Sequence, residues 1–258
     1  MGVDLQTITQ LRNRTGAGIA DCKHALEEAG GDIEKAIENL RKRGEVKAAK
    51  KADRTTKEGL VGVAKEGNKV ATVVLACETD FVAKNEDFIT AVSEYANKLL
   101  STSPDEFRVW AEENVKGELV VKIGENIQLG EYGVVEGEVV GTYLHSNNKA
   151  AGIVALTGGD QELANDIAMH IVAMSPEYLG AVDVPNEVIE KEKDIYREQM
   201  KDIDKPEEIK EKIIEGKLKK FYSEVCLLNQ EYIKEDGKKV SELLQEGIEI
   251  KEFKKFSV

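Results

Sequence analysis

Two acidic residues at the end of an apolar run are the first candidates for chemistry in this sequence. Glu78 and Asp80 follow the run VATVVLAC (70–77) within the stretch ETDFVAKN. If an extended strand continues through them, both carboxylates lie on one face, as an acid–base pair requires. Acids two residues apart are also common at strand ends, and no nucleophile or base joins them in the pattern. We therefore predict that the chain is not an enzyme, and an enzyme using this pair ranks third among our hypotheses.

Histidines and cysteines are scattered along the chain rather than clustered. They show neither a CxxC pair nor the spacing of metal ligands. The glycine-rich stretch TGAGIAD lacks the spacing of a phosphate-binding loop. His170, alone in DIAMHIVAMS, is typical of a helix residue whose ring is satisfied within the fold. We therefore expect no metal and no cofactor. The cysteines and histidines considered as ligands are Cys22, Cys77, Cys226, His24, His145 and His170.

The stretch ETDFVAKN also holds an apolar pair, Phe81 and Val82, between an expected strand and an expected helix. Asn85 is a good N-cap for that helix, and its apolar stripe begins at Phe88. Phe81 lies outside the stripe, four residues before the cap. The pair either covers the edge of the core or presents a hydrophobic wedge to a partner. Composition alone favours the first interpretation, in which the pair covers the edge of the core. The second interpretation, a wedge presented to a partner, stays open.

Charge is distributed unevenly along the chain. The net charge of −13 argues against a surface wrapped by nucleic acid. Residues 41–57 carry eight Lys and Arg against two acids, a local charge of +6. This segment is either a solvated helix end with a linker or a contact for RNA or an acidic partner. No apolar run approaches the roughly 20 residues that a membrane span needs, and we expect a cytoplasmic protein.

Three short helices are predicted in the first 45 residues. Asp4 caps the first, the second begins at Ile19, and Asp32 caps the third. Gly44 is placed as the glycine that ends the third helix. We assign 1–45 to a three-helix module and 46–57 to a basic linker.

A strand–turn–strand–helix pattern is then written twice, from Glu58 and again from Glu136. The repeat predicts an α+β fold with two related subdomains, at 58–135 and 136–258. Charged helical periodicity over about 186–229 predicts an antiparallel helical hairpin inserted in the second subdomain. The last segment, GIEIKEFKKFSV, is expected to return to the second sheet.

Several long blocks resemble the bacterial elongation factor Ts family. LRNRTGAGIADCKHALEEAGGDIEKAIENLRKRG is similar to its amino-terminal ubiquitin-associated-type module. EGLVG, ETDFVAKNEDF, KIGENI and MHIVAMSPEYL match its later blocks in the same order. The resemblance implies a guanine-nucleotide exchange factor that binds elongation factor Tu, GDP-bound or nucleotide-free, displaces Mg²⁺ and promotes GDP release. An RNA- or ribosome-binding protein using 41–57 is the alternative.

The resemblance also implies which residues bind the partner. It assigns Mg²⁺ displacement to the segment Thr79, Asp80, Phe81 and Val82. Further contacts are implied for Ile123, Gly124 and His170 on the docking face and for Ile19 and Lys23 in the first module. It implies no membrane and no direct nucleic-acid binding, and it leaves a homodimer open.

Overall fold

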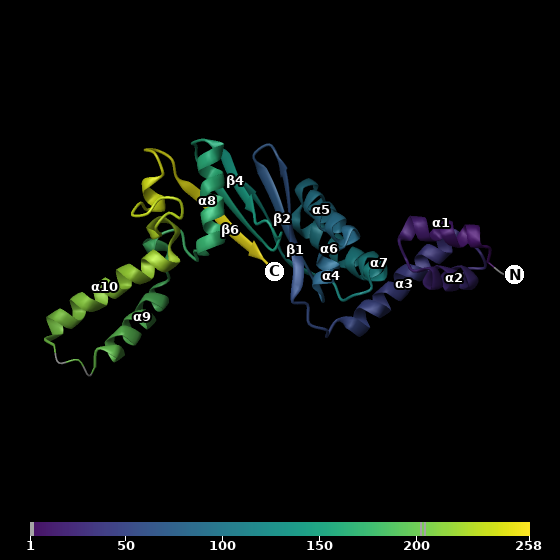
Figure 1. Ribbon diagram of the computed structural model, residues 1–258, viewed down its shortest axis with the longest axis horizontal. Coiled ribbons are helices and arrows are strands. Elements are labelled where there is room, and N and C mark those ends of the chain that lie inside the picture. Colours follow the sequence, from purple (N-terminus) through teal and green to yellow (C-terminus); the bar gives the residue numbers. More distant parts are fainter. Residues whose placement is uncertain (1–2, 202, 204) are drawn as a thin grey trace. The chain divides into compact units, whose positions relative to one another are not determined.

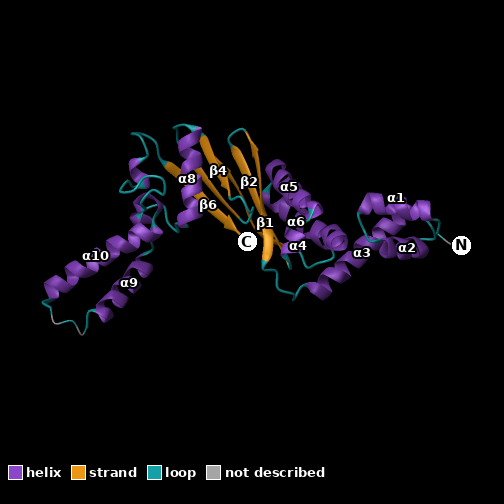
Figure 2. Cartoon of the chain, viewed as in Figure 1, coloured by secondary structure: helices purple, strands orange, loops and turns teal. Residues whose placement is uncertain are grey.

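The computed structural model describes residues 3–201, 203 and 205–258, and the fold is α+β. The chain divides into two compact units, each described by itself. Unit 1 runs from the N-terminal end to Val134 and includes Ser146–Ala150 and Phe256–Val258. Unit 2 comprises Val135–His145 and Ala151–Lys255. Within the described residues, the strands form two three-stranded sheets (Figure 2).

Unit 1 begins with three helices that start where the sequence predicts. They are α1 (Leu5–Thr15), α2 (Ile19–Glu28) and α3 (Ile33–Lys51) (Figure 1). The Asp4 carboxylate accepts hydrogen bonds from two backbone amides in the first turn of α1, and the Asp32 carboxylate accepts one, from Lys35, in the first turn of α3. These acceptors satisfy amides that have no partner inside the helix. The helices share a small core of Ile8, Leu11, Ala17, Cys22, Ala25, Leu26, Ala36 and Leu40.

The prediction that α3 ends at Gly44 is wrong, because the helix continues to Lys51. Residues 46–51, assigned to a linker, are therefore helical. Gly44 is buried, and a Cβ atom there would lie 2.6 Å from Val121 Cγ2 and 2.7 Å from the Lys116 carbonyl oxygen. The glycine serves a close approach between α3 and the π-helical turn η1 (Val115–Leu119) with the segment after it. A glycine of this kind looks like a helix end when only the local sequence is considered.

The sheet of unit 1 has the order β1-β2-β3 (Glu58–Glu66, Lys69–Cys77 and Gln128–Glu136). Strands β1 and β2 are antiparallel, with Glu58 opposite Cys77 and Glu66 opposite Lys69. Helix α5 (Glu86–Ser101), capped by Asn85, contacts both strands. Its predicted stripe is confirmed, since Phe88, Ala91, Val92, Tyr95, Ala96 and Leu99 are all buried.

Short helices complete unit 1 around this sheet. The strand β2 leads through α4 (Asp80–Ala83) into α5, and α6 (Pro104–Asn114) begins with a capping box of Ser103 and Glu106. The turn η1 then joins α6 to α7 (Val120–Ile123), which ends at Gly124. The segment after α7 leads into β3.

Unit 2 repeats the strand–turn–strand–helix order with β4 (Val139–Leu144), β5 (Ala150–Leu156) and α8 (Gln161–Met174). In both units a strand glycine lies directly beneath the helix. A Cβ atom on Gly62 would lie 2.5 Å from the Val92 carbonyl oxygen of α5, and one on Gly141 would lie 2.1 Å from the Ala164 carbonyl oxygen of α8. The final strand, β6 (Ile250–Ser257), pairs with β5, so its predicted return to the second sheet is confirmed.

The rest of unit 2 is mainly helical. Helices α9 (Asn186–Gln199) and α10 (Glu207–Val225) pack on one another through Met200, Ile214 and Leu218 (Figure 1). Unit 2 also contains short 3₁₀ turns before α9, at Ala181–Asp183 (η2), and after α10, at Leu227–Asn229 (η3) and Val240–Glu242 (η4).

His170 lies in the core of unit 2, on α8. Its ring is fully buried beside Tyr232, and Nε2 lies 2.9 Å from the Gln230 side-chain oxygen. The Gln230 amide nitrogen donates to the Glu224 carbonyl, which directs its oxygen toward the ring. Nε2 is therefore the protonated nitrogen, and Nδ1 has no hydrogen-bond partner among the described residues. Burial lowers the pKa of His170, so the ring is neutral.

Replacing the packed glycine should destabilise the chain. We expect Gly44→Ala to lower the free energy of unfolding by about 1–3 kcal/mol, because the new methyl group overpacks the contact with Val121. Gly216→Ala is the matched control, since Gly216 is also helical but a Cβ atom there meets open space. Gly216→Ala should raise the free energy of unfolding by about 0.5–1 kcal/mol. Urea unfolding of both variants tests this; equal effects would contradict the packing role of Gly44.

The buried histidine should make stability depend on pH. Near and below its ordinary pKa of about 6.5 the unfolded chain binds a proton at His170 more readily than the folded chain, in which burial lowers the pKa. The unfolded state then holds more protons, so the free energy of unfolding falls as the pH drops from about 7.5 to 5.5. His170→Gln should flatten that dependence, and the exposed His24→Gln serves as comparison. Parallel pH curves for wild type and His170→Gln would show that the buried ring does not contribute.

Candidate partner-binding site

The joint between β2 and α5 separates the two apolar residues that the sequence presents as a pair. Val82 is partly buried against the core of unit 1, and Ala83 is buried. Phe81, on the other side of α4, is 83% exposed. The joint therefore anchors itself through Val82 and Ala83 and presents Phe81 outward. The core-covering interpretation holds for Val82 only.

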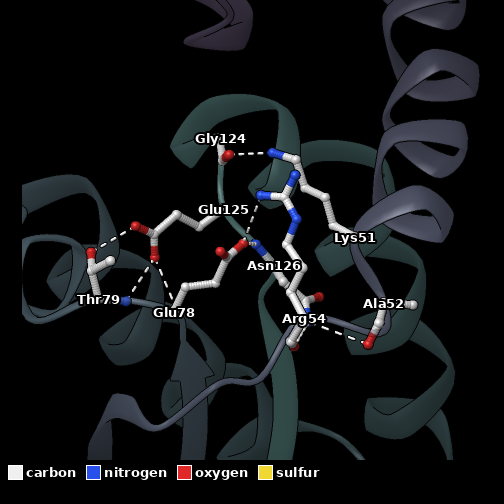
Figure 3. Close-up of polar contacts among 8 residues, drawn as sticks. All are labelled: Lys51, Ala52, Arg54, Glu78, Thr79, Gly124, Glu125 and Asn126. Atoms are coloured by element: carbon white, nitrogen blue, oxygen red, sulfur yellow. Dashed lines mark hydrogen bonds and ion pairs between the residues drawn. The ribbon is translucent and has the colours of Figure 1, made fainter.

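Two glutamates fix this joint by crossed hydrogen bonds (Figure 3). The Glu125 carboxylate accepts the backbone amides of Glu78 and Thr79, each at 3.0 Å, and the Thr79 hydroxyl at 2.6 Å. In return, the Glu78 carboxylate accepts the backbone amide of Asn126 at 2.6 Å. The segment at 78–79 and the loop at 125–126 thus hold each other in place.

The end of α3 joins the same network. The side-chain nitrogen of Asn126 donates to the Arg54 carbonyl oxygen at 2.8 Å, and Asn126 itself is buried. Arg54 Nη1 lies 3.4 Å from Glu78 Oε1, and Lys51 Nζ donates to the Gly124 carbonyl (Figure 3). Three segments far apart in sequence therefore converge at the residues that precede α4.

The two acids considered for catalysis do not form a pair. Glu78 faces Asn126 and Arg54, whereas Asp80 forms an ion pair with Lys84 at 2.7 Å on the surface. The hydrogen bond and charge of Lys84 lower the pKa of Asp80, and those of Asp80 raise the pKa of Lys84. Each carboxylate thus has its own donor, which argues against a shared acid–base site.

The predicted contact residues fall into different parts of the chain. Ile123 ends α7 and is partly buried, and Gly124 caps that helix in the left-handed region with φ of 86°. They lead directly into Glu125 and so lie next to the Thr79 joint. Ile19 is exposed at the start of α2, where Lys23 pairs with Glu27. His170 is fully buried in unit 2, so its ring presents no surface to a partner in this conformation.

Most of the basic segment is neutralised within the chain. Five of its eight cationic side chains form ion pairs with acids, and Lys51 donates to a backbone carbonyl. The local charge of +6 is thereby largely offset, which disfavours the RNA-binding alternative. The five pairs are Arg41–Glu118, Lys42–Glu38, Arg43–Glu28, Lys47–Asp21 and Arg54–Glu78.

Sequence reasoning missed Glu125 and Asn126, although both lie in the block KIGENI. Their one local signal is a polar pair directly after a helix-ending glycine. Among the described residues, no group of three His, Cys, Asp or Glu side chains is arranged to hold a metal ion. Nor does any helix in the described ranges combine the length and the apolar character that a bilayer crossing requires.

Comparison with known proteins identifies the family. The family model described as "Elongation factor TS" matches residues 78–258, beginning directly after β2. Elongation factor Ts of Hydrogenobaculum sp. is 44% identical over 277 aligned residues, covering 100% of this chain and 99% of that protein. The Hahella chejuensis protein of the same name is 42% identical over 95% of this chain and 87% of its own length. That of Deinococcus deserti is 40% identical over 98% and 99%, respectively. The chain therefore belongs to the elongation factor Ts family.

Proposed function

We propose that this chain, a nucleotide-exchange factor for elongation factor Tu in translation elongation, releases GDP by inserting Phe81 into its partner. The observation that carries the proposal is the 83% exposure of Phe81 on a helix whose other face is anchored in the core. Exposed aromatic side chains are enriched in the buried centres of protein interfaces. An aromatic group held in advance by rigid structure loses little conformational freedom when it binds.

The partner's nucleotide site explains why such an insertion would release GDP. A GTPase holds its nucleotide partly through Mg²⁺, which bridges phosphate oxygens to the protein. A ring inserted beside that site displaces the elements that coordinate the metal. Because coupling between two ligands is reciprocal, a factor that prefers the nucleotide-free partner lowers the affinity for GDP by the same ratio.

The neighbours of Phe81 would have separate roles. Asp80 carries a negative charge next to the ring, balanced by Lys84 in the free protein. Near the phosphates and Mg²⁺ of the partner, that charge would compete with the phosphates for the metal. Thr79 and Val82 would act from behind, by starting α4 and by anchoring it.

The remaining assignments complete the proposal. The first three helices would form a ubiquitin-associated-type module whose Ile19 and Lys23 make a second contact. Ile123 and Gly124 would flank the docking face, and His170 would act through the core that it supports. Helices α9 and α10 would be a hairpin inserted in the second subdomain. The factor would act in the cytoplasm, without chemical catalysis and without binding nucleic acid directly.

Phe81→Ala should remove most of the exchange activity. We expect the rate of GDP release from elongation factor Tu, at limiting factor concentration, to fall by at least about tenfold, because the ring is the central anchor. The melting temperature should stay close to that of wild type, since the ring is exposed. Release of fluorescent GDP in stopped flow provides the measurement.

Val182→Ala is the matched control, because it removes another strongly exposed apolar side chain from a different part of the chain. Its release rate should equal that of wild type. If Phe81→Ala released GDP as fast as wild type, insertion of the ring would not be the mechanism.

A further inference from the structure

We propose that Glu125 is a positioning residue for exchange, because its carboxylate starts α4 and thereby sets the direction of Phe81. This inference rests on the proposed role of Phe81. Glu125 is partly buried behind the joint and is 46 residues from Thr79 in the sequence. It acts on the partner only through the segment that it holds.

Helix α4 needs outside support because it is only four residues long. An isolated helix of that length is unstable, and the amides of its first turn lack partners within it. The Thr79 hydroxyl oxygen accepts the amide of Val82 at 3.3 Å and so forms the N-cap. That hydroxyl in turn donates to Glu125, which also accepts the Thr79 amide. The start of α4 is therefore fixed by one carboxylate.

The arrangement is a capping box whose acid comes from another segment. At the start of α6, the Ser103 hydroxyl accepts the Glu106 amide at 3.3 Å, and the Glu106 carboxylate accepts the Ser103 amide and hydroxyl at 3.1 and 2.7 Å. There the acid is the third residue of the helix, as is usual. In α4 that third position is Val82, whose side chain packs on the core. Glu125 supplies the missing carboxylate from the loop after α7.

Glu125 is itself held on both sides. The Gly124 carbonyl before it accepts from Lys51, and the Asn126 amide after it donates to Glu78. Hydrogen bonds to an ionised carboxylate are stronger than those between neutral groups. The loop, the end of α3 and the joint thus behave as one support, and removing the Glu125 carboxylate would free α4 without exposing the core.

The experiment measures release of fluorescent GDP from GDP-loaded elongation factor Tu by full-length variants. Glu125→Ala should slow release roughly tenfold, within the range expected when a helix loses its cap. In the Phe81→Ala background, the same change should alter the rate by less than about twofold, because no ring is left to position. Glu125→Gln, which keeps one acceptor oxygen, should lie between wild type and Glu125→Ala.

Glu106→Ala is the control, because it removes the corresponding amide and hydroxyl hydrogen bonds from the N-cap of α6, although Glu125 accepts one further amide, that of Glu78. Glu106→Ala should lower the melting temperature about as much as Glu125→Ala does. It should leave the rate of GDP release within about twofold of wild type. A melting temperature measured for every variant separates loss of fold from loss of position. If Glu125→Ala does not fold at the assay temperature, the same comparison is made with Glu125→Gln in both backgrounds.

The outcomes separate the two proposals. If wild type does not accelerate release, or if Phe81→Ala is as fast as wild type, the proposed function fails whatever Glu125 does. If those two results hold, three findings would overturn the positioning role. They are an unchanged rate in the Glu125 variants, an equal slowing with and without the Phe81 ring, and a loss of rate that Glu106→Ala reproduces at equal stability.

Discussion

The hydrogen bonds of the Glu125 carboxylate are the interaction on which the presentation of Phe81 depends. A large aromatic side chain exposed to water has no packing of its own to hold it. Its position must come from the backbone beneath it, and that backbone is a single short helical turn. The turn is stable because the Thr79 hydroxyl, itself held by Glu125, accepts the Val82 amide, and because Val82 and Ala83 pack inward. Together, these polar and apolar contacts fix the turn and leave the Phe81 side chain exposed.

The same network explains how the charge of the basic segment is used. Lys51 and Arg54, near the end of α3, contact the 124–126 loop and Glu78. Most of the other cations pair with acids of unit 1. Most of this positive charge thus serves internal contacts, which disfavours a surface for phosphates. A charge count along the sequence does not distinguish these uses, because both need lysines and arginines close together.

Glycines set how closely the elements of each unit approach. Gly62 and Gly141 lie beneath α5 and α8, where any side chain would collide with a helix carbonyl. The repeated order of elements therefore carries a repeated packing device. Gly44 plays a similar part between α3 and η1. Close packing and chain reversal both favour glycine, so the residue type alone does not indicate which one applies.

The sequence by itself determined the local structure of this protein. Residues only a few positions apart determine three features. These are the caps that start helices at Asp4, Asp32 and Asn85, the apolar stripe of α5, and the repeated order of elements. The α+β class follows from that order. These features are readable because caps and periodicity act over one or two helical turns. The resemblance of the blocks likewise indicated the family that the comparisons confirm.

Only the tertiary structure decided the fate of individual residues at the site. Phe81 and Val82 are adjacent and both apolar, yet one is exposed and the other packs on the core. Gly44 lies within a helix, and His170 is enclosed by its own unit. The acid that completes the cap of α4 comes from a loop 46 residues away. No local pattern encodes that partner, because its place depends on how the chain folds back.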